Sequence, residues 1–305
     1  MLFQYALEPE VLPSYERCRY FFEKFGIHRG RLLGSFPPTW LRLVEAGLQK
    51  ERDEGRCTEM EFTRATVMLT NVKTCMVPRA GDYNEKSSWL NNAENEHFRQ
   101  PFHAIIATQN PRRREFVLRG GELDETHPLW KVPASVSVDR EAAAMAALVF
   151  PLLQISETLV FVDPHFGPET LRYRLAFKEL ITACTRGRAN DPHSVVYLTG
   201  TYAQNDFFLQ ECQAQLPRLV PQGLTVRMTK LSERVGGQKL HNRFVMSERG
   251  GISLGIGLDK GSAGESDDAF LLDLDLHAKR WAEYMGTMPA FDECCSTEVV
   301  GTAKR

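Results

Sequence analysis

Residues 239–259 read KLHNRFVMSERGGISLGIGLD, and this stretch decides how the second half of the chain is expected to fold. Its apolar residues predict two strands, over residues 240–246 and 251–254, joined by a tight turn at a Gly-Gly pair. Side chains two apart on a strand point to the same face, so His241 and Arg243 are expected to project together. An imidazole can attack phosphorus or shuttle a proton, and a guanidinium can bind two phosphate oxygens. The stretch therefore predicts a site for a phosphodiester.

Strands and helices alternate upstream of this stretch, from residue 139 onwards. Apolar runs typical of buried strands occupy residues 159–162, 195–198 and 224–228. Patterns with helical spacing occupy residues 141–153, 171–184, 207–216 and 270–284, the first of them capped by Asp139. This alternation predicts an α/β domain over residues 139–305, with a mixed or largely parallel sheet flanked by helices.

The first 138 residues lack this regularity. Helices are expected over residues 14–25, 40–48 and 58–76, where Thr58 and Glu61 have the spacing of a capping box. Residues 102–107 and 115–118 are interpreted as a β-hairpin, and the turn-rich residues 120–133 as a linker. These elements predict a smaller α+β domain, residues 1–138, whose role the sequence does not indicate.

The spacing of polar residues in the late stretch resembles the signature of the phospholipase D superfamily. That signature is H-x-K, four residues, D, six residues, then G-S-x-N. Here His241, Arg243, Glu248 and Gly255 stand at those positions, with Arg replacing Lys and Glu replacing Asp. The Ser and Asn positions hold Ile256 and Leu258. The resemblance covers roughly residues 139 to 285, and it extends to a non-catalytic, membrane-binding member in which H-x-R also replaces H-x-K.

The resemblance implies a two-step cleavage of a phosphodiester that needs no metal or other cofactor. His241 is the expected nucleophile, forming a phosphohistidine, while a second histidine protonates the leaving oxygen. Arg243 is expected to neutralise the phosphoryl charge, and Glu248 to hold His241 in the required tautomer. Catalytic members of the superfamily use two such motifs, and this chain offers one. The implied working form is therefore a two-fold homodimer that brings two copies of His241 together.

Further residues near the motif are candidates for binding the ligand. Lys239 and Arg243 supply positive charge, and Gly255 and Gly257 let the backbone approach a phosphate closely. Candidates for lining the same cleft follow the predicted strands, at the ends where open α/β sheets place ligands. They are His165, Tyr202 and Asp259. Aspartates at 267, 268, 273 and 275 and His277 are interpreted as capping and surface groups rather than metal ligands.

Composition restricts the remaining possibilities. The formal net charge of -2 excludes a globally basic nucleic-acid binder but not a local basic groove. One candidate outside the motif is the basic turn Pro111-Arg112-Arg113-Arg114, typical of a solvated loop but able to clamp an anionic backbone or headgroup. Seven cysteines without a C-x-x-C pair favour a reducing compartment, and the first residues make a poor signal peptide. A cytoplasmic location is therefore expected.

Three functional hypotheses remain open at this stage. The first is a homodimeric phosphodiesterase or nuclease acting on nucleic acid through His241. The second is a catalytically degenerate module that binds a phosphate-bearing ligand or holds a protein complex through residues 1–138, with nucleic acid favoured over membrane headgroups. The third is a subunit that contributes shape to a defence or repair assembly.

Overall fold

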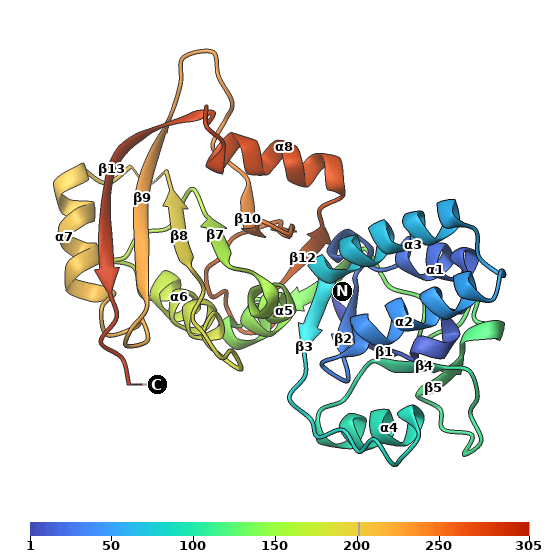
Figure 1. Cartoon of the computed structure of the whole chain (residues 1–305). Coiled ribbons are helices and arrows are strands. Elements are labelled where there is room, and N and C mark those ends of the chain that lie inside the picture. The colour runs from blue at the N-terminus through green and yellow to red at the C-terminus, as the bar shows by residue number, and fades with distance from the viewer. Residues whose placement is uncertain (201, 305) are drawn as a thin grey trace. The chain divides into compact units, whose positions relative to one another are not determined.

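The computed structural model describes residues 1–200 and 202–304. The chain divides into two compact units, Leu2–Pro133 and the chain from Ala134 onwards, and each is described by itself (Figure 1). The boundary expected from the sequence, after residue 138, falls inside strand β6 (Ser135–Asp139). That strand is short, polar and half-exposed, so it carries no apolar run that would separate it from a linker.

The first unit contains a parallel sheet with the strand order β3-β2-β1-β4-β5. Its strands are β1 (Phe3–Leu7), β2 (Arg31–Ser35), β3 (Met76–Pro78), β4 (Ala104–Ala107) and β5 (Val117–Arg119). Its α-helices are α1 (Tyr15–Phe22), α2 (Trp40–Asp53), α3 (Glu59–Val72) and α4 (Trp89–Arg99). Single 3-10 turns lie at Pro9–Val11, Ile27–Arg29, Lys73–Cys75 and Gly120–Glu122. The unit is therefore α/β, and the expected α+β assignment is wrong.

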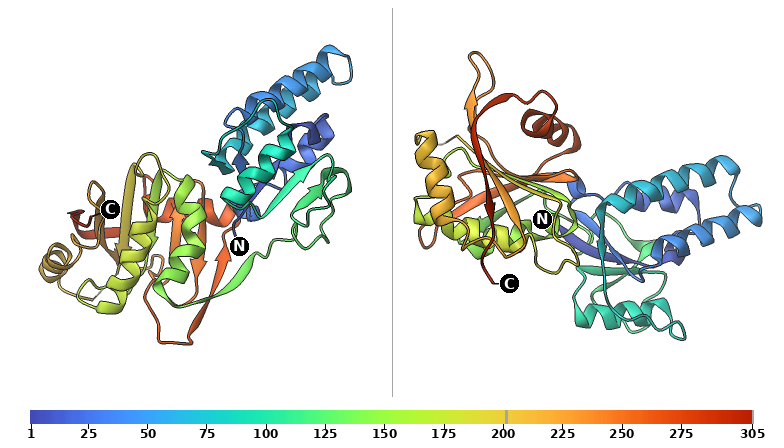
Figure 2. Two further views of the ribbon diagram at one scale, coloured as in Figure 1. Left: turned by 90° about the horizontal axis from the view of Figure 1, so that it is seen from below. Right: turned by 60° about the vertical axis from the view of Figure 1, so that its left-hand side comes forward.

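The strand order reverses direction at β1. The chain runs outward from β1 to β2 and β3, and then returns to the other side of β1 to form β4. Right-handed crossovers on opposite sides of β1 place α1, α2 and α3 on one face of the sheet and α4 on the other. Figure 1 shows α4 apart from the other three helices, and Figure 2 gives two further views of the unit. Open sheets of this kind bind ligands beyond the carboxyl ends of their strands.

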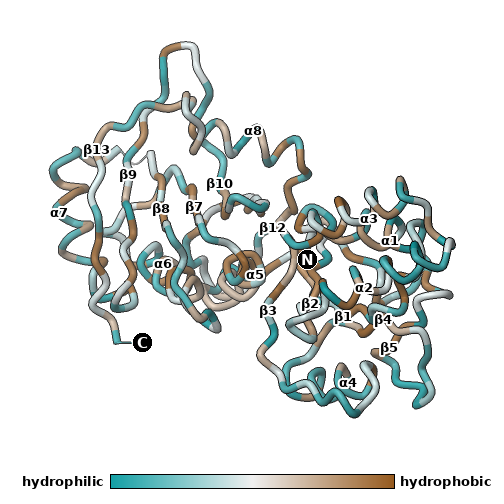
Figure 3. Tube along the Cα trace, viewed as in Figure 1, coloured by the Kyte–Doolittle hydropathy of each residue, from teal (hydrophilic) through white to brown (hydrophobic). Residues whose placement is uncertain are grey.

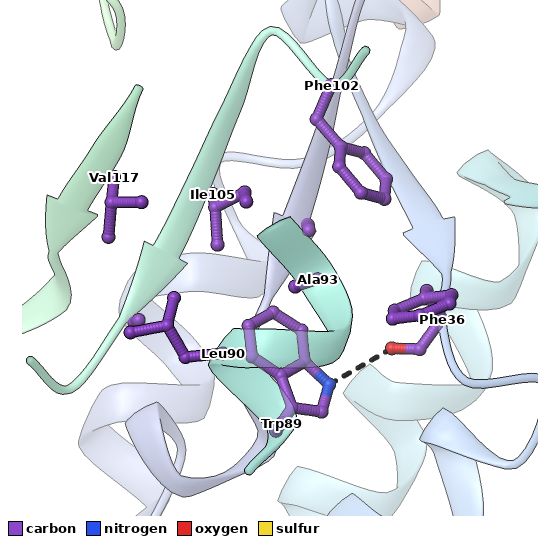
Figure 4. Close-up of a cluster of buried hydrophobic side chains, with 9 residues drawn as sticks. Phe36, Trp89, Leu90, Ala93, Phe102, Ile105 and Val117 are labelled. Carbon is purple, nitrogen blue, oxygen red and sulfur yellow. Dashed lines mark hydrogen bonds between the residues drawn. The ribbon is translucent and has the colours of Figure 1, made fainter. Parts of the chain in front are cut away.

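Helix α4 packs on the sheet through one apolar face (Figure 4). Trp89 and Leu90 precede Ala93 by four and three residues, so both lie on the same side of the helix as Ala93. They contact a cluster that includes Ile105 and Phe36. The indole Nε1 of Trp89 donates a hydrogen bond of 3.2 Å to the carbonyl oxygen of Phe36, which satisfies its one polar atom inside the core.

Strands β4 and β5 are parallel neighbours, with Ile105 opposite Val117, so the hairpin expected at this place is wrong. The connecting loop returns the chain to the amino end of β5 without a helix. The side chain of Asn110 stabilises this path, because its Nδ2 donates to the carbonyl oxygens of Arg114 and Val117 while its Oδ1 accepts from the N–H of Arg114. The Asn-Pro pair that suggested a two-strand turn instead begins a longer loop.

The second unit contains an eight-stranded mixed sheet in the order β13-β9-β8-β7-β10-β11-β12-β6. Besides β6, the strands are β7 (Thr158–Val162), β8 (Ser194–Thr199), β9 (Thr225–Glu233), β10 (Arg243–Ser247), β11 (Gly250–Leu254), β12 (Ser266–Leu271) and β13 (Phe291–Val300). Strands β7, β8 and β9 are parallel, and the other neighbouring pairs are antiparallel. The predicted α/β class with a mixed sheet and flanking helices is confirmed.

The helices of this unit are α5 (Ala142–Ile155), α6 (Leu171–Ala183), α7 (Asn205–Gln215) and α8 (Leu274–Met285). Helix α5 is apolar on all sides, as Figure 3 shows, which suits a helix buried against the sheet. The last helix begins at Leu274 rather than residue 270, because Asp273 caps it by accepting from the N–H of Leu276. No helix in the described ranges has both the length and the apolar character needed to cross a membrane.

Candidate functional site

Strand β10 brings the late motif to the carboxyl end of β7. The two strands are antiparallel, with Phe244 opposite Val162, and β10 also pairs antiparallel with β11, with Arg243 opposite Leu254. The start of β10, the loop after β7 and the loop after β11 therefore meet at one edge of the sheet. We call this edge the motif edge; it comprises His241–Arg243, Asp163–His165 and Gly255–Asp259.

His241 lies just before β10 rather than within it, so the expected strand over residues 240–246 begins too early. The side chain is exposed, and its Nδ1 lies 3.1 Å from the carbonyl oxygen of Lys239. A carbonyl oxygen can only accept, so a hydrogen bond here requires a proton on Nδ1. This tautomer leaves the lone pair on Nε2, the form in which an imidazole acts as a nucleophile or base.

Arg243 occupies the first position of β10 and is half-buried. Its Nη1 donates a hydrogen bond of 2.7 Å to the carbonyl oxygen of His241, which fixes the guanidinium against the backbone of that residue. Its Nε is buried and has no hydrogen-bond partner among the described residues. The structure thus brings the two predicted residues together, through a backbone contact rather than through a shared strand face.

Asp163 connects the loops of the motif edge. Its side chain is 1% exposed, and its carboxylate accepts from the backbone N–H of His165 at 2.9 Å and of Leu258 at 2.7 Å. Burial raises the pKa of the Asp163 carboxyl, and the nearby charge of Asp259 raises it further, whereas the two backbone hydrogen bonds and the charge of Arg243 act to lower it. This carboxyl therefore lies within electrostatic range of both Arg243 and Asp259.

A cleft of about 440 Å³ opens beside Asp163. Its lining comprises Arg140, His165, Thr170, Arg172, Tyr173, Ile256 and Asp259. His165 and Asp259 thus line a cleft, but it is not the cleft predicted for them. The sequence predicted that they line the same cleft as His241 and Arg243, and neither of those residues is in this lining.

Two arginines that the sequence analysis missed line this cleft. The Nη2 of Arg140 lies 2.6 Å from one carboxylate oxygen of Asp259, and the Nε of Arg172 lies 3.3 Å from the other. Arg140 also pairs with Glu265 at 3.1 Å, so the two guanidinium groups face two carboxylates. Arg140 follows an edge strand and Arg172 lies in the first turn of α6, so neither position has a pattern that marks it as functional.

The other groups that the sequence predicted to contact the ligand are either bonded within the protein or exposed to solvent. Lys239 forms an exposed ion pair of 2.6 Å with Glu233. The backbone N–H groups of Gly255 and Ile256 donate to the carboxylate of Asp267, so Gly255 does not offer its N–H to a phosphate. Tyr202 is 97% exposed and points into solvent, away from any lining role.

Gly257 has a structural reason to be glycine. A Cβ at this position would lie 2.5 Å from a carboxylate oxygen of Asp259 and 3.5 Å from one of Asp163. The backbone therefore passes directly against both carboxylates. The close approach predicted for Gly257 exists, but the groups it approaches are protein carboxylates.

Glu248 does not orient His241, which corrects the role inferred from the motif. The five residues of β10 lie between them, a length of about 17 Å at roughly 3.3 Å per residue. The Glu248 carboxylate instead accepts 2.9 Å hydrogen bonds from the backbone N–H groups of Glu157 and Thr158, at the start of β7. Glu248 therefore fastens the opposite end of the sheet.

Replacing Glu248 with alanine is expected to reduce stability and leave ligand binding unchanged. Two charge-assisted hydrogen bonds are lost, which corresponds to about 1–2 kcal/mol in the free energy of unfolding because the site is partly exposed. Urea unfolding measures this change, and Glu298→Ala, at an exposed position of β13, is the matched control with an expected change below about 0.5 kcal/mol. Weaker phosphate binding at unchanged stability would contradict the structural role.

Comparison of the chain with protein-family models, curated protein sequences and solved structures finds no match. The case for a function therefore depends on the geometry of the motif edge. That edge offers an exposed imidazole whose Nδ1 contacts a backbone carbonyl, a guanidinium fixed against the backbone of His241, and a cleft lined by two arginines. Such groups bind and attack phosphate esters rather than neutral substrates.

Proposed function

We propose that the second unit is a phospholipase-D-like domain that binds and cleaves phosphodiesters at the motif edge. The observation that carries the proposal is the pairing of His241 with Arg243. The Lys239 carbonyl fixes the tautomer of the imidazole, and the His241 carbonyl fixes the guanidinium. A phosphoryl group held by the guanidinium would lie near the imidazole, whose Nε2 carries the lone pair when the proton is on Nδ1.

The proposed reaction has two steps. The Nε2 of His241 bonds to phosphorus while the bond from phosphorus to the leaving oxygen breaks, and the imidazole of a second copy of the chain gives that oxygen its proton. Water then attacks the phosphohistidine, its proton passes to the second imidazole, and the bond between phosphorus and nitrogen breaks. Arg243 neutralises the phosphoryl oxygens in both steps. The second imidazole makes a homodimer the working form.

Nucleic acid is the proposed substrate class. His241 is exposed rather than enclosed, so a polymer can pass across it. The arginines of the neighbouring cleft, Arg140 and Arg172, can contact a phosphate next to the scissile one. A membrane headgroup that presents a single phosphate would have no second phosphate for Arg140 and Arg172 to contact.

A specific observation favours the second candidate, a binding module without activity. Ile256 and Leu258 occupy the two positions where the resemblance expects a hydroxyl and an amide donor, and Leu258 is 1% exposed. The nearby N–H groups of Gly255 and Ile256 are bonded to Asp267. Transition-state stabilisation therefore depends on arginine side chains, which bind phosphate in the ground state as well.

Cleavage and binding assays separate the two candidates. We expect the full chain to cleave labelled single-stranded DNA, RNA or bis-p-nitrophenyl phosphate in the presence of EDTA. Binding with steep salt dependence but no cleavage would select the module. If the chain neither binds nor cleaves any of these substrates, both candidates are refuted. If light scattering shows a strict monomer during turnover, the paired site is refuted.

A further inference from the structure

The loop between β4 and β5 in the first unit carries a concentration of positive charge. Residues 108–119 read TQNPRRREFVLR, with four arginines and one glutamate. Asn110 fixes the path of the loop through its three hydrogen bonds to Arg114 and Val117. Arg113 has a φ of 52°, in the left-handed region that most side chains avoid. We call residues 108–119 the arginine loop.

The four arginines have different partners. Arg112 forms a 2.8 Å ion pair with the buried Glu94, and Arg119 pairs with Glu122. These pairs hold the loop and neutralise their own charge. Arg113 is exposed and, among the described residues, its guanidinium has no hydrogen-bond or ion-pair partner. Arg114 is also exposed, and its guanidinium carbon lies 5.8 Å from the centre of the Phe98 ring. The charge left for an external ligand therefore lies on Arg113 and Arg114.

A hollow of about 650 Å³ lies against the arginine loop. It is lined by Thr108, Gln109, Asn110, Pro111, Arg113 and Arg119. Thr108 and Arg119 adjoin the carboxyl ends of β4 and β5, the end of the sheet at which doubly wound folds bind ligands. The hydroxyl of Thr108 donates to the carboxylate of Glu8, and the amide of Asn110 donates within the loop. The guanidinium of Arg113 is therefore the donor that this hollow offers to phosphate oxygens.

An exposed aromatic ring, that of Phe98, lies close to the arginine loop. Phe98 on α4 is 62% exposed, and the guanidinium carbon of Arg114 lies 5.8 Å from the centre of its ring. The ring of Phe116 supports it edge-on at 5.9 Å, and His97 stacks on Phe116 at 3.9 Å. Phe98 is thus an exposed ring supported by Phe116, with the positive charge of Arg114 beside it.

We propose that the arginine loop and Phe98 bind single-stranded nucleic acid. Arg113 would hold a phosphate in the hollow, and an unpaired base would stack on Phe98 next to Arg114. Base stacking on an aromatic ring next to arginines is the usual arrangement for sequence-tolerant binding of single strands. A duplex keeps its bases stacked inside and gains nothing from Phe98. The site belongs to the first unit and does not depend on the function proposed for the second.

Fluorescence anisotropy with labelled (dT)20 tests the proposal on the full chain. Phe98→Ala is expected to weaken binding by roughly 5- to 100-fold with an unchanged salt slope, because it removes stacking alone. Arg113→Ala is expected to weaken binding by roughly 3- to 10-fold and to reduce the salt slope by about one, because it removes a phosphate contact. Phe98→Trp, which keeps the ring, is expected to bind like the wild type.

Controls separate this site from the motif edge. Arg64→Ala removes an exposed arginine on α3 and is expected to leave binding unchanged. The effects of Phe98→Ala and Arg113→Ala are expected to persist in an Arg243→Ala background. The proposal would be overturned if adding Phe98→Ala or Arg113→Ala to the Arg243→Ala variant left its affinity unchanged. The proposal would also be overturned if phosphatidylserine vesicles competed with (dT)20 for the protein and Phe98→Ala did not change vesicle binding.

Discussion

His241→Ala is expected to lower phosphodiester cleavage by a factor of roughly 10³ or more. The substitution removes the nitrogen that attacks phosphorus, so cleavage has to proceed by direct attack of water. Because His241 is exposed and no described residue depends on its side chain for packing, the protein is expected to fold normally. Initial rates with bis-p-nitrophenyl phosphate in EDTA measure the effect.

His193→Ala is the matched control for this loss. His193 is also exposed, but it precedes β8 at the opposite end of that strand from the motif edge. Its removal is expected to leave the rate unchanged. Equal rates for His241→Ala and His193→Ala would show that any observed cleavage takes place elsewhere, and would leave only the binding role for the motif edge.

Arg140→Ala is expected to lower the free energy of unfolding by about 3–5 kcal/mol. The side chains of Arg140 and Asp259 are 10% and 8% exposed, so the substitution leaves a carboxylate buried without its closest partner. Arg172 remains 3.3 Å away, but 61% of its side chain is exposed, and solvent screens its charge. Urea unfolding of the full chain measures the loss.

A double substitution identifies the cause. Removing both charges in Arg140→Ala/Asp259→Ala is expected to recover part of the stability that Arg140→Ala loses, because no buried charge then lacks a partner. Arg218→Ala, at an exposed position, is expected to change stability by less than about 0.5 kcal/mol. Losses that simply add in the double variant would contradict the coupling of Arg140 and Asp259.

Buried elements of the second unit could be predicted from the sequence because burial leaves a pattern. The apolar run at 159–162 became β7, the run at 195–198 became β8, and the amphipathic segment at 171–184 became α6. Edge strands have no such run. β13, with the sequence FDECCSTEVV, is largely exposed and was not expected, and most of β6 was assigned to the first domain without being predicted as a strand.

The first unit was misjudged because its strands are short. β1 and β2 have five residues each, too few for periodicity to separate strand from helix. Their pairing joins residues far apart in the chain, and β4 pairs with β1 across nearly a hundred residues. Without those two strands, the helices between them gave no sign of a parallel sheet.

The candidate site was predictable where it depends on local sequence. His241 and Arg243 lie two residues apart and do come together. The cleft arginines, at 140 and 172, meet Asp259 only through the tertiary fold. The role given to Glu248 failed for a geometric reason, because an extended strand lies between it and His241.

The central claim is that His241 and Arg243 together hold a phosphate ester. Titration of the full chain with dimethyl phosphate, followed by the Cε1–H resonances of the histidines in NMR, tests it most directly. The His241 resonance is the one that is absent from the spectrum of His241→Ala. It is predicted to shift saturably in the wild type and to stay in place in Arg243→Ala. The resonance of His193 is predicted to stay unchanged in both. A His241 resonance that does not move at any dimethyl phosphate concentration would contradict the account.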